Sequence, residues 1–308
     1  MRKHFISILL VILLPFSAAA FSGCSTARHL TQKVIPADTP DLKKQIAVMP
    51  FETVMGPEWG TGSQIADALT GLLENYPGLL IFRPDKGESL FSGENQHDFN
   101  VPTSPEIFKK AEDLGINALV TGVLYQVETR TAKKGIWPFR KYVRVFEIFM
   151  SVNVQDVISR VLLLSSLESR EIPVKLDEAE GRKDEDFAEK VMKEAMAGIL
   201  KKQAAAVSKA LAGSPFTGRI LAVEPDGITI NIGKATGLKP GKYFEVFDRG
   251  ETILSGNGQT ITLLGNRIGE IRVTSVMESH SLAVPEGEGD YLPGLAIRYK
   301  GQAGFRSR

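Results

Sequence analysis

The sequence of 308 residues predicts an α/β (α+β) sandwich domain followed by a small all-β barrel-like domain. In the first half, strand-like apolar runs alternate with helical periodicity, and a strand meander with a closing helix follows. After Gly213-Ser214-Pro215, which interrupts the helix, only short strands separated by glycine-rich turns remain. We therefore expect one domain over residues 45–213, a second over 214–300 and a disordered tail over 301–308.

The first part of the sandwich domain alternates between strand and helix signals. Ser104-Pro105 begins a helix, because serine is a good N-cap and proline is tolerated in the first turn. Gly115 suits the left-handed position at the end of that helix. The predicted elements are a strand over 46–51, a helix over 63–76, a strand over 79–82 and a helix over 104–115.

Three longer strands and a helix complete this domain. In the middle strand, apolar side chains such as Ile148, Met150 and Val152 alternate with polar ones, so one face is expected to be buried. The predicted strands are 117–129, 142–156 and 160–171, and the closing helix with its apolar stripe is 183–211. The strands of the second domain are 218–223, 228–232, 243–247, 267–276 and 281–284.

The N-terminus carries an export signal over residues 1–23. A basic head, Arg2 and Lys3, precedes an apolar run over 6–16 that is shorter than the roughly 20 residues of a membrane span. Phe21-Ser22-Gly23-Cys24 resembles the lipobox of bacterial lipoproteins, which implies cleavage before Cys24 and acylation of its thiol. Cys24 is the only cysteine in the chain, so it has no partner for an internal disulfide.

The lipobox resemblance also implies a destination. Ser25 follows the cysteine where retention in the inner membrane of enterobacteria uses aspartate, so an outer-membrane anchor facing the periplasm is expected. Several acyl chains together make a lasting anchor. Residues 24–44 show no clear period and contain Pro36 and Pro40, which predicts a flexible tether.

Both predicted domains resemble known families. The first resemblance rests on residues 46–51, 65–73, 115–122 and 152–163, and the second on residues 216–220, 230–233, 237–241 and 268–273. On its residues, the first domain resembles the N-terminal domain of TolB and its relatives, which include the curli secretion channel CsgG and lipoprotein activators of penicillin-binding proteins. The second domain resembles the C-terminal domain of flagellar assembly protein T, whose separate N-terminal domain has no counterpart here.

Composition and motifs argue against several functions. Loss of Arg2 and Lys3 with the signal lowers Lys+Arg from 37 to 35 against 36 Asp+Glu, so no nucleic-acid partner is expected. The remaining histidines lack ligand spacing, which predicts no metal site. Gly60-Thr61-Gly62 lacks the rest of a phosphate-binding motif and predicts a flexible loop with a helix start, so no cofactor is expected. No nucleophile and base pair stands out, and we expect a protein that is not an enzyme.

The segment 130–141 is the candidate site for a partner. It is basic at both ends and holds Trp137 and Phe139 between them, followed by Arg140 and Lys141. Tryptophan and arginine dominate binding hot spots, so these four residues are candidates for contact with a partner protein. Two alternatives stay open: the aromatic rings fold back on their own sheet, or they enter anionic lipid.

These observations favour a lipoprotein that scaffolds or assists the assembly of an envelope machine, either a flagellar basal body or a secretion system. An activator of a cell-wall synthase is the second reading, and a CsgG-like export pore subunit is the third. The expected partners are the membrane, through the N-terminal lipid anchor, and envelope proteins, with self-association into a homo-oligomer as a further expectation.

Overall fold

The fold was derived from a computed structural model that describes residues 41–54, 61–83, 97–98, 101–102, 104–175, 185–254 and 260–301. The export signal, Cys24, the tether up to residue 40 and the tail from residue 302 lie outside these ranges. Within residues Pro40–Arg308, which form one unit, two regions are distinguished below. The sheet region extends to the end of the last helix, and the barrel follows it.

The sheet region is built on a mixed sheet of seven strands. The strands are β1 (Lys44–Val48), β2 (Glu52–Thr53), β3 (Leu79–Ile81), β6 (Ala118–Leu124), β7 (Glu128–Lys134), β8 (Lys141–Asp156) and β9 (Leu162–Lys175). β1 pairs in parallel with β3 and β6, and β2 pairs in parallel with β6. The pairings of β8 are antiparallel, with β6 and β7 following each other along one edge and β9 along the other. A separate pair of short strands joins β4 (His97–Asp98) to β5 (Val101–Pro102).

The long central strand β8 confirms the predicted alternation. Ile148, Met150 and Val152 are fully buried on one face. The single strand expected over 117–129 is wrong in its extent, because the chain divides there into β6 and β7. β6 is apolar and buried along its whole length, whereas β7 is charged and mostly exposed, so the two segments suit different environments.

Three helices are described beside this sheet, α2 (Gly62–Leu73), α3 (Pro105–Asp113) and α5 (Glu185–Ala212). Thr61 caps α2: its hydroxyl accepts from the Gln64 amide at 3.3 Å, and the Gln64 side chain accepts from the Thr61 amide at 2.9 Å. Gly62 leaves no room for a side chain, because a Cβ there would lie 1.7 Å from the Phe51 carbonyl oxygen. The expected helix start is therefore confirmed. Gly115 takes the left-handed conformation predicted for it, with φ +70°.

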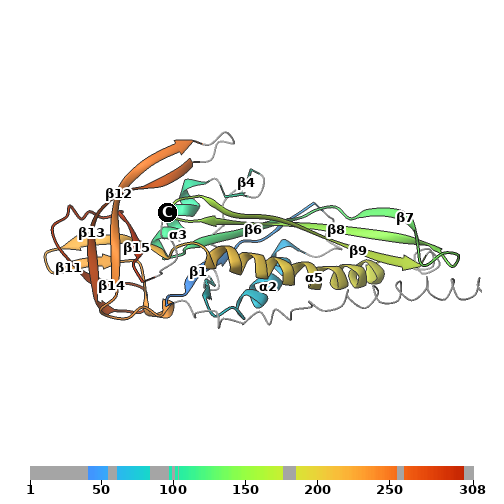
Figure 1. Ribbon diagram of the computed structural model, residues 1–308, viewed down its shortest axis with the longest axis horizontal. Coiled ribbons are helices and arrows are strands. Elements are labelled where there is room, and N and C mark those ends of the chain that lie inside the picture. Colours follow the sequence, from blue (N-terminus) through green and yellow to red (C-terminus); the bar gives the residue numbers. More distant parts are fainter. Residues whose placement is uncertain are drawn as a thin grey trace, which may run out of the picture. The chain divides into compact units, whose positions relative to one another are not determined.

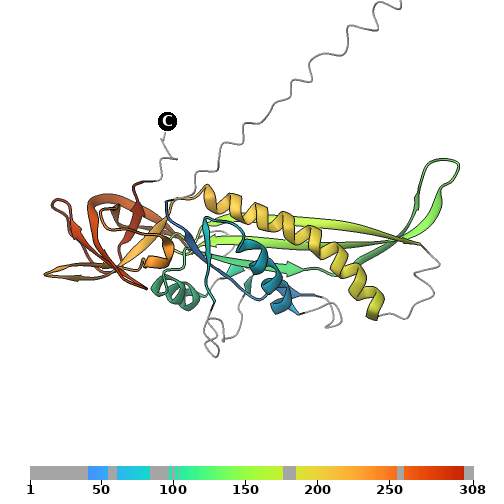
Figure 2. The ribbon, with the colours of Figure 1, turned by 90° about the horizontal axis from the view of Figure 1, so that it is seen from below.

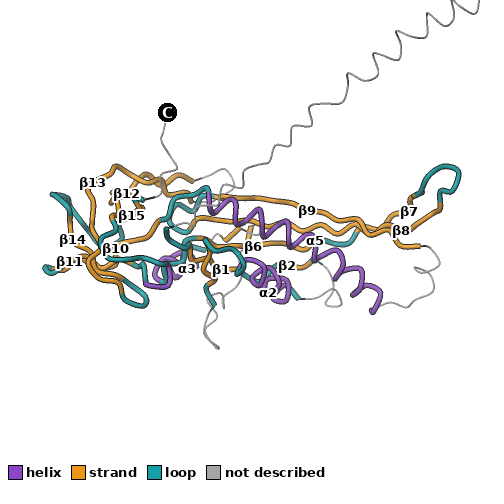
Figure 3. The backbone as a smooth tube through the Cα atoms, turned by 60° about the horizontal axis from the view of Figure 1, so that its bottom comes forward, coloured by secondary structure: helices purple, strands orange, loops and turns teal. Residues whose placement is uncertain are grey.

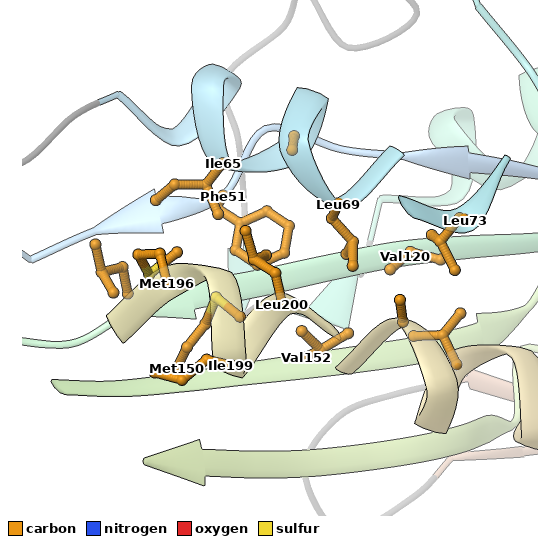
Figure 4. Close-up of a cluster of buried hydrophobic side chains, with 14 of the residues drawn as sticks. Phe51, Ile65, Leu69, Leu73, Val120, Met150, Val152, Met196, Ile199 and Leu200 are labelled. Carbon is orange, nitrogen blue, oxygen red and sulfur yellow. The ribbon is translucent and has the colours of Figure 1, made fainter. Parts of the chain in front are cut away.

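The helices cover both faces of the sheet. Ile46 and Val120 belong to the core beneath α2 and α5, whereas their neighbours in the same strands, Ala47 and Leu119, pack with α3. Figures 1 and 2 show α2 and α5 along one face of β6, β8 and β9. The side chains that fill this core interlock in Figure 4. The core therefore sits mainly between the sheet and the α2–α5 pair.

The barrel consists of six strands hydrogen-bonded in a closed ring, in the order β10-β11-β14-β13-β12-β15. They are β10 (Thr217–Glu224), β11 (Gly227–Ile230), β12 (Tyr243–Leu254), β13 (Thr260–Val276), β14 (Ser281–Pro285) and β15 (Ala296–Tyr299), with a short 3-10 helix at Lys234–Thr236. The sequence did not predict β15, because four residues are too few to show a period. β12 and β13 are longer than expected. Their additional residues 249–254 and 260–264 pair with each other and form an arm whose apolar side chains are partly exposed.

The last four residues of the expected tether are folded, so that prediction is wrong for residues 41–44. Leu42 is buried in the core of the barrel, the Lys43 amide donates to the Thr236 carbonyl at 2.8 Å, and Lys44 begins β1. One apolar residue between charged neighbours has no periodic pattern. Leu42 is buried because residues far along the chain form the barrel core into which its side chain packs.

Polar contacts join the two regions. Asn117 Nδ2 donates to the Thr217 carbonyl at 2.6 Å, and Asn231 Nδ2 donates to the Glu112 carbonyl at 2.7 Å. Lys44 Nζ donates to the Leu211 carbonyl at the end of α5 and to the Ser214 carbonyl beyond it, and burial lowers the pKa of this lysine to about 8. α5 ends and β10 begins on either side of the expected break at 213–215. That residues 214–300 form an independent domain stays a prediction.

Candidate functional site

The candidate site is the loop that joins β7 to β8, residues 135–140, called the tip loop below (Figure 3). Gly135 has φ +118°, which favours glycine, and a Cβ there would lie 3.2 Å from the Phe139 carbonyl oxygen. The Phe139 amide donates to the Ile136 carbonyl at 2.8 Å and closes a turn around the cis Trp137-Pro138 peptide. The loop is shorter than the expected segment 130–141, because β7 continues to Lys134.

The tip loop presents its large apolar side chains to solvent. Ile136, Trp137 and Phe139 are 85%, 78% and 81% exposed, and Tyr142 at the start of β8 is also exposed. The alternative in which Trp137 and Phe139 fold back on their own sheet is therefore wrong. The sequence reasoning did not single out Ile136 and Tyr142, although both flank the two predicted aromatic residues.

Cations flank the tip loop in the two adjoining strands, and they differ in their partners. Arg130 and Lys134 of β7 both form ion pairs with Glu171 of β9, the second at 3.0 Å. The hydrogen bond from Lys134 is the main cause that lowers the pKa of Glu171. Lys133 lies 4.7 Å from the centre of the Tyr142 ring.

Arg140 and Lys141, the two cations that the sequence singled out, are exposed and form no ion pair with a described residue. Their charges are therefore open to an acidic partner, whereas Arg130 and Lys134 are already paired. The structure places Trp137, Phe139 and Arg140 in the tip loop and Lys141 directly after it, at the first position of β8. Their role in binding stays a prediction.

Other predicted features lie elsewhere or outside the described residues. Cys24 is outside them, and the side chain of His97 in β4 is not described. The His280 ring lies 3.2 Å from the Ser279 hydroxyl. Among the described residues, no group of three or more His, Cys, Asp or Glu side chains could hold a metal ion. In the same part of the chain, no helix is both long and apolar enough to cross a membrane.

Comparison with known proteins finds similarity only among solved structures. No family model matches the sequence, and no curated protein does.

Three solved structures illustrate the similarity. The hypothetical protein CT253 from Chlamydia trachomatis is 12% identical, with 56% of this chain and all of that chain covered and a TM-score of 0.38. The lipoprotein GNA1162 from Neisseria meningitidis is 17% identical, with 56% and 99% covered and a TM-score of 0.29. TolB from Acinetobacter baumannii is 16% identical, with 77% and 45% covered and a TM-score of 0.27. At these scores the similarity assigns neither a family nor a function to the chain.

Proposed function

We propose that this chain is a non-enzymatic lipoprotein of the bacterial cell envelope that scaffolds or assists the assembly of an envelope machine. Acyl chains on Cys24 anchor it to the outer membrane, with the folded part in the periplasm, and the tip loop binds a partner protein. The observation that carries the proposal is the exposed group Ile136, Trp137 and Phe139 between cations.

The physical case for binding starts from solvation. Three large apolar side chains in contact with water gain free energy when a partner covers them, at about 25 cal/mol for each Å² of apolar surface. The turn closed by the hydrogen bond between Phe139 and Ile136 holds them in place, which reduces the entropy lost on binding. Arg140 adds a guanidinium without a described partner, and arginine with tryptophan is typical of hot spots. An acidic surface with an apolar pocket complements this loop.

Three kinds of machine fit this role, and the sequence resemblances set their order. Assembly of a flagellar basal body or secretion system comes first, and activation of a cell-wall synthase comes second. An export pore subunit comes third, because a spanning strand needs an apolar face toward lipid. β7 carries Glu128, Arg130, Lys133 and Lys134 among its seven residues, which counts against such a face. The functions of neighbouring genes would separate the three.

Site-specific photo-crosslinking in growing cells tests the docking role. With a photoreactive phenylalanine derivative in place of Trp137, we expect discrete adducts with one envelope protein. The matched control places the same group at Leu167, an exposed apolar residue of β9, and should give none of these adducts. Adducts with lipid alone, or equal adducts from both positions, would exclude a protein-docking tip loop.

Mass spectrometry of the mature N-terminus tests the anchor separately. We expect a chain that begins at Cys24 and carries acyl chains, and Cys24→Ala should abolish both cleavage at that site and membrane attachment. An unmodified chain that begins elsewhere would refute the anchor and leave the docking result intact.

A further inference from the structure

A cavity lies where the sheet region meets the barrel. Its volume is about 250 Å³, below the 300–1,000 Å³ usual for larger ligands, so it suits a small molecule or ion. Both regions line it, with Glu112 from α3 and the turn after β8 on one side and strands of the barrel on the other. Thr262 in the arm links the barrel to the turn after β8, because its backbone amide donates a hydrogen bond to the Ser159 carbonyl at 2.9 Å.

Three arginines from three separate elements line this cavity: Arg160 after β8, Arg219 in β10 and Arg249 in β12. Arg219 and Arg249 converge at Gly294. A Cβ placed there would lie 3.9 Å from Arg219 Nη1 and 3.6 Å from Arg249 Nη2. Two guanidinium groups near one point repel each other unless an anion lies near them.

Arg219 is only partly neutralised. It forms an ion pair with Glu112 at 3.0 Å, and its Nη1 donates to the Gly294 carbonyl at 2.9 Å. Its Nε is buried and has no hydrogen-bond partner among the described residues. A buried donor without an acceptor is costly, especially in a charged group. Burial raises the pKa of Glu112, while Arg219 and Arg160 oppose that rise, so both cations lie near this carboxyl group.

Arg160 ends the short turn between β8 and β9, and this position explains its conformation. Its φ is 59°, in the left-handed region, and among the described residues it is the only non-glycine residue with a positive φ. The last residue of a short hairpin turn commonly takes this conformation. The Arg160 guanidinium lies 5.1 Å from the centre of the Phe108 ring, and no ion pair of this group with a described residue is found.

The cavity as a whole has an excess of positive charge. Glu112 and Asp248 are the carboxylates in its lining, against the three arginines. Glu112 is already paired with Arg219. The Asp248 carboxylate lies against Gly265, where a Cβ would come within 1.6 Å of its Oδ1 atom. Arg160 and Arg249 therefore remain available to a ligand.

We propose that this cavity binds a small oxyanion, a carboxylate or a phosphate, through Arg160, Arg219 and Arg249. Planar guanidinium groups suit both anions, because each can donate two parallel hydrogen bonds to two oxygens. Thr252 and Thr262 line the same cavity and offer hydroxyl donors. The ligand contacts both regions at once and so stabilises their junction.

The test measures the thermal unfolding of the full chain with inorganic phosphate in one arm and acetate in the other. Sodium chloride at the same ionic strength is the reference for both arms. Because a ligand that binds only the folded state stabilises it, we expect Tm to rise with the concentration of one probe and then saturate. The arm that responds identifies the chemistry. No rise beyond that with chloride in either arm would overturn the proposal.

Variants locate the binding. Arg249→Ala removes an exposed guanidinium and should weaken the apparent affinity at least about tenfold. Arg160→Gly should do the same while keeping the fold, because glycine readily adopts the left-handed conformation. Arg83→Ala removes an exposed arginine that does not line the cavity; it is the matched control and should leave the affinity unchanged. Retention of full affinity in both Arg249→Ala and Arg160→Gly would also overturn the proposal.

Discussion

The sheet region and the barrel obtain their cores in different ways. Every buried side chain in the two cores of the sheet region comes from between Ile46 and Leu211, in one continuous stretch of chain. The barrel core takes Leu42 from before that stretch and the rest from Phe216 onward. The sheet region lies between the two contributions in sequence. The boundary at 213–215 therefore marks a change of secondary structure. It does not separate the two cores, because Leu42 of the barrel core comes from before it in the chain.

This difference predicts unequal dependence on residues outside each region. The core of the sheet region needs none of the barrel, whereas the barrel loses a core side chain if the chain before β1 is removed. A fragment of residues 214–300 should therefore be less stable than the barrel within the full chain. The following substitutions test this comparison, from the largest expected effect to the smallest.

Leu42→Ala should lower the free energy of unfolding by about 2–5 kcal/mol, the range for a buried leucine replaced by alanine. Denaturant unfolding measures the change. Leu254→Ala is the matched control, because Leu254 is a barrel residue with 71% of its surface exposed, and should change stability by less than about 0.5 kcal/mol. Equal small effects would mean that the barrel core does not need the chain before β1.

Lys44 makes the end of α5 sensitive to pH. Burial lowers its pKa in the folded protein from 10.5 to about 8, so between these values the unfolded chain binds more protons. The free energy of unfolding should therefore rise with pH over this window, and the contribution is flat below it. The rise from this residue is about 3–4 kcal/mol at most, at roughly 1.4 kcal/mol for each pKa unit.

The difference between wild type and Lys44→Met in denaturant unfolding at pH 7.5 and about pH 10 isolates this contribution. In Lys44→Met the rise should disappear. Lys43→Met is the matched control, because the neighbouring Lys43 is exposed, and should keep it. A pH dependence that is the same in all three proteins would show that Lys44 stays protonated in the folded state.

Asn231→Ala should weaken the junction between the regions by about 1–3 kcal/mol. Its Nδ2 donates to the Glu112 carbonyl and its Oδ1 accepts from the Arg219 amide, both at 2.7 Å, so two partners lose a buried contact. Hydrogen exchange should increase in α3 and β10. Asn75→Ala, whose side chain makes exposed hydrogen bonds within its own helix end, provides the comparison and should leave both segments protected.

Trp137→Ala should have the smallest effect on folding, less than about 0.5 kcal/mol, because the tip loop contributes nothing to either core. A thermal melt measures this. A loss of about 3–5 kcal/mol, as for a core tryptophan, would mean that the ring packs on the sheet in solution.

The sequence predicted elements whose signals are local. The alternation in β8 and the left-handed Gly115 depend on a few neighbours, and both are found in the structure. The tip-loop aromatics were identified for the same reason, since a basic turn holds them. The expected cap is not found: the Ser104 side chain makes no capping hydrogen bond at the start of α3.

Other features depend on distant parts of the chain. Leu42 enters a barrel whose strands begin about 175 residues later, and Arg160, Arg219 and Arg249 meet only after two regions pack together. No periodic pattern marks such residues. The division of 117–129 into β6 and β7 depends in turn on how two strands share one edge of β8.

The strand pairings also limit how copies of this chain can associate. The six barrel strands close into a ring, and in the sheet region the outer edge of β9 is unpaired among the described strands. That edge contains Pro173, which has no amide proton, and charged residues at Glu168, Arg170 and Glu171. Extension of a sheet from one copy to the next is therefore disfavoured at the β9 edge. A second copy that paired through its backbone would have to use another unpaired edge of the sheet, β3 or β7.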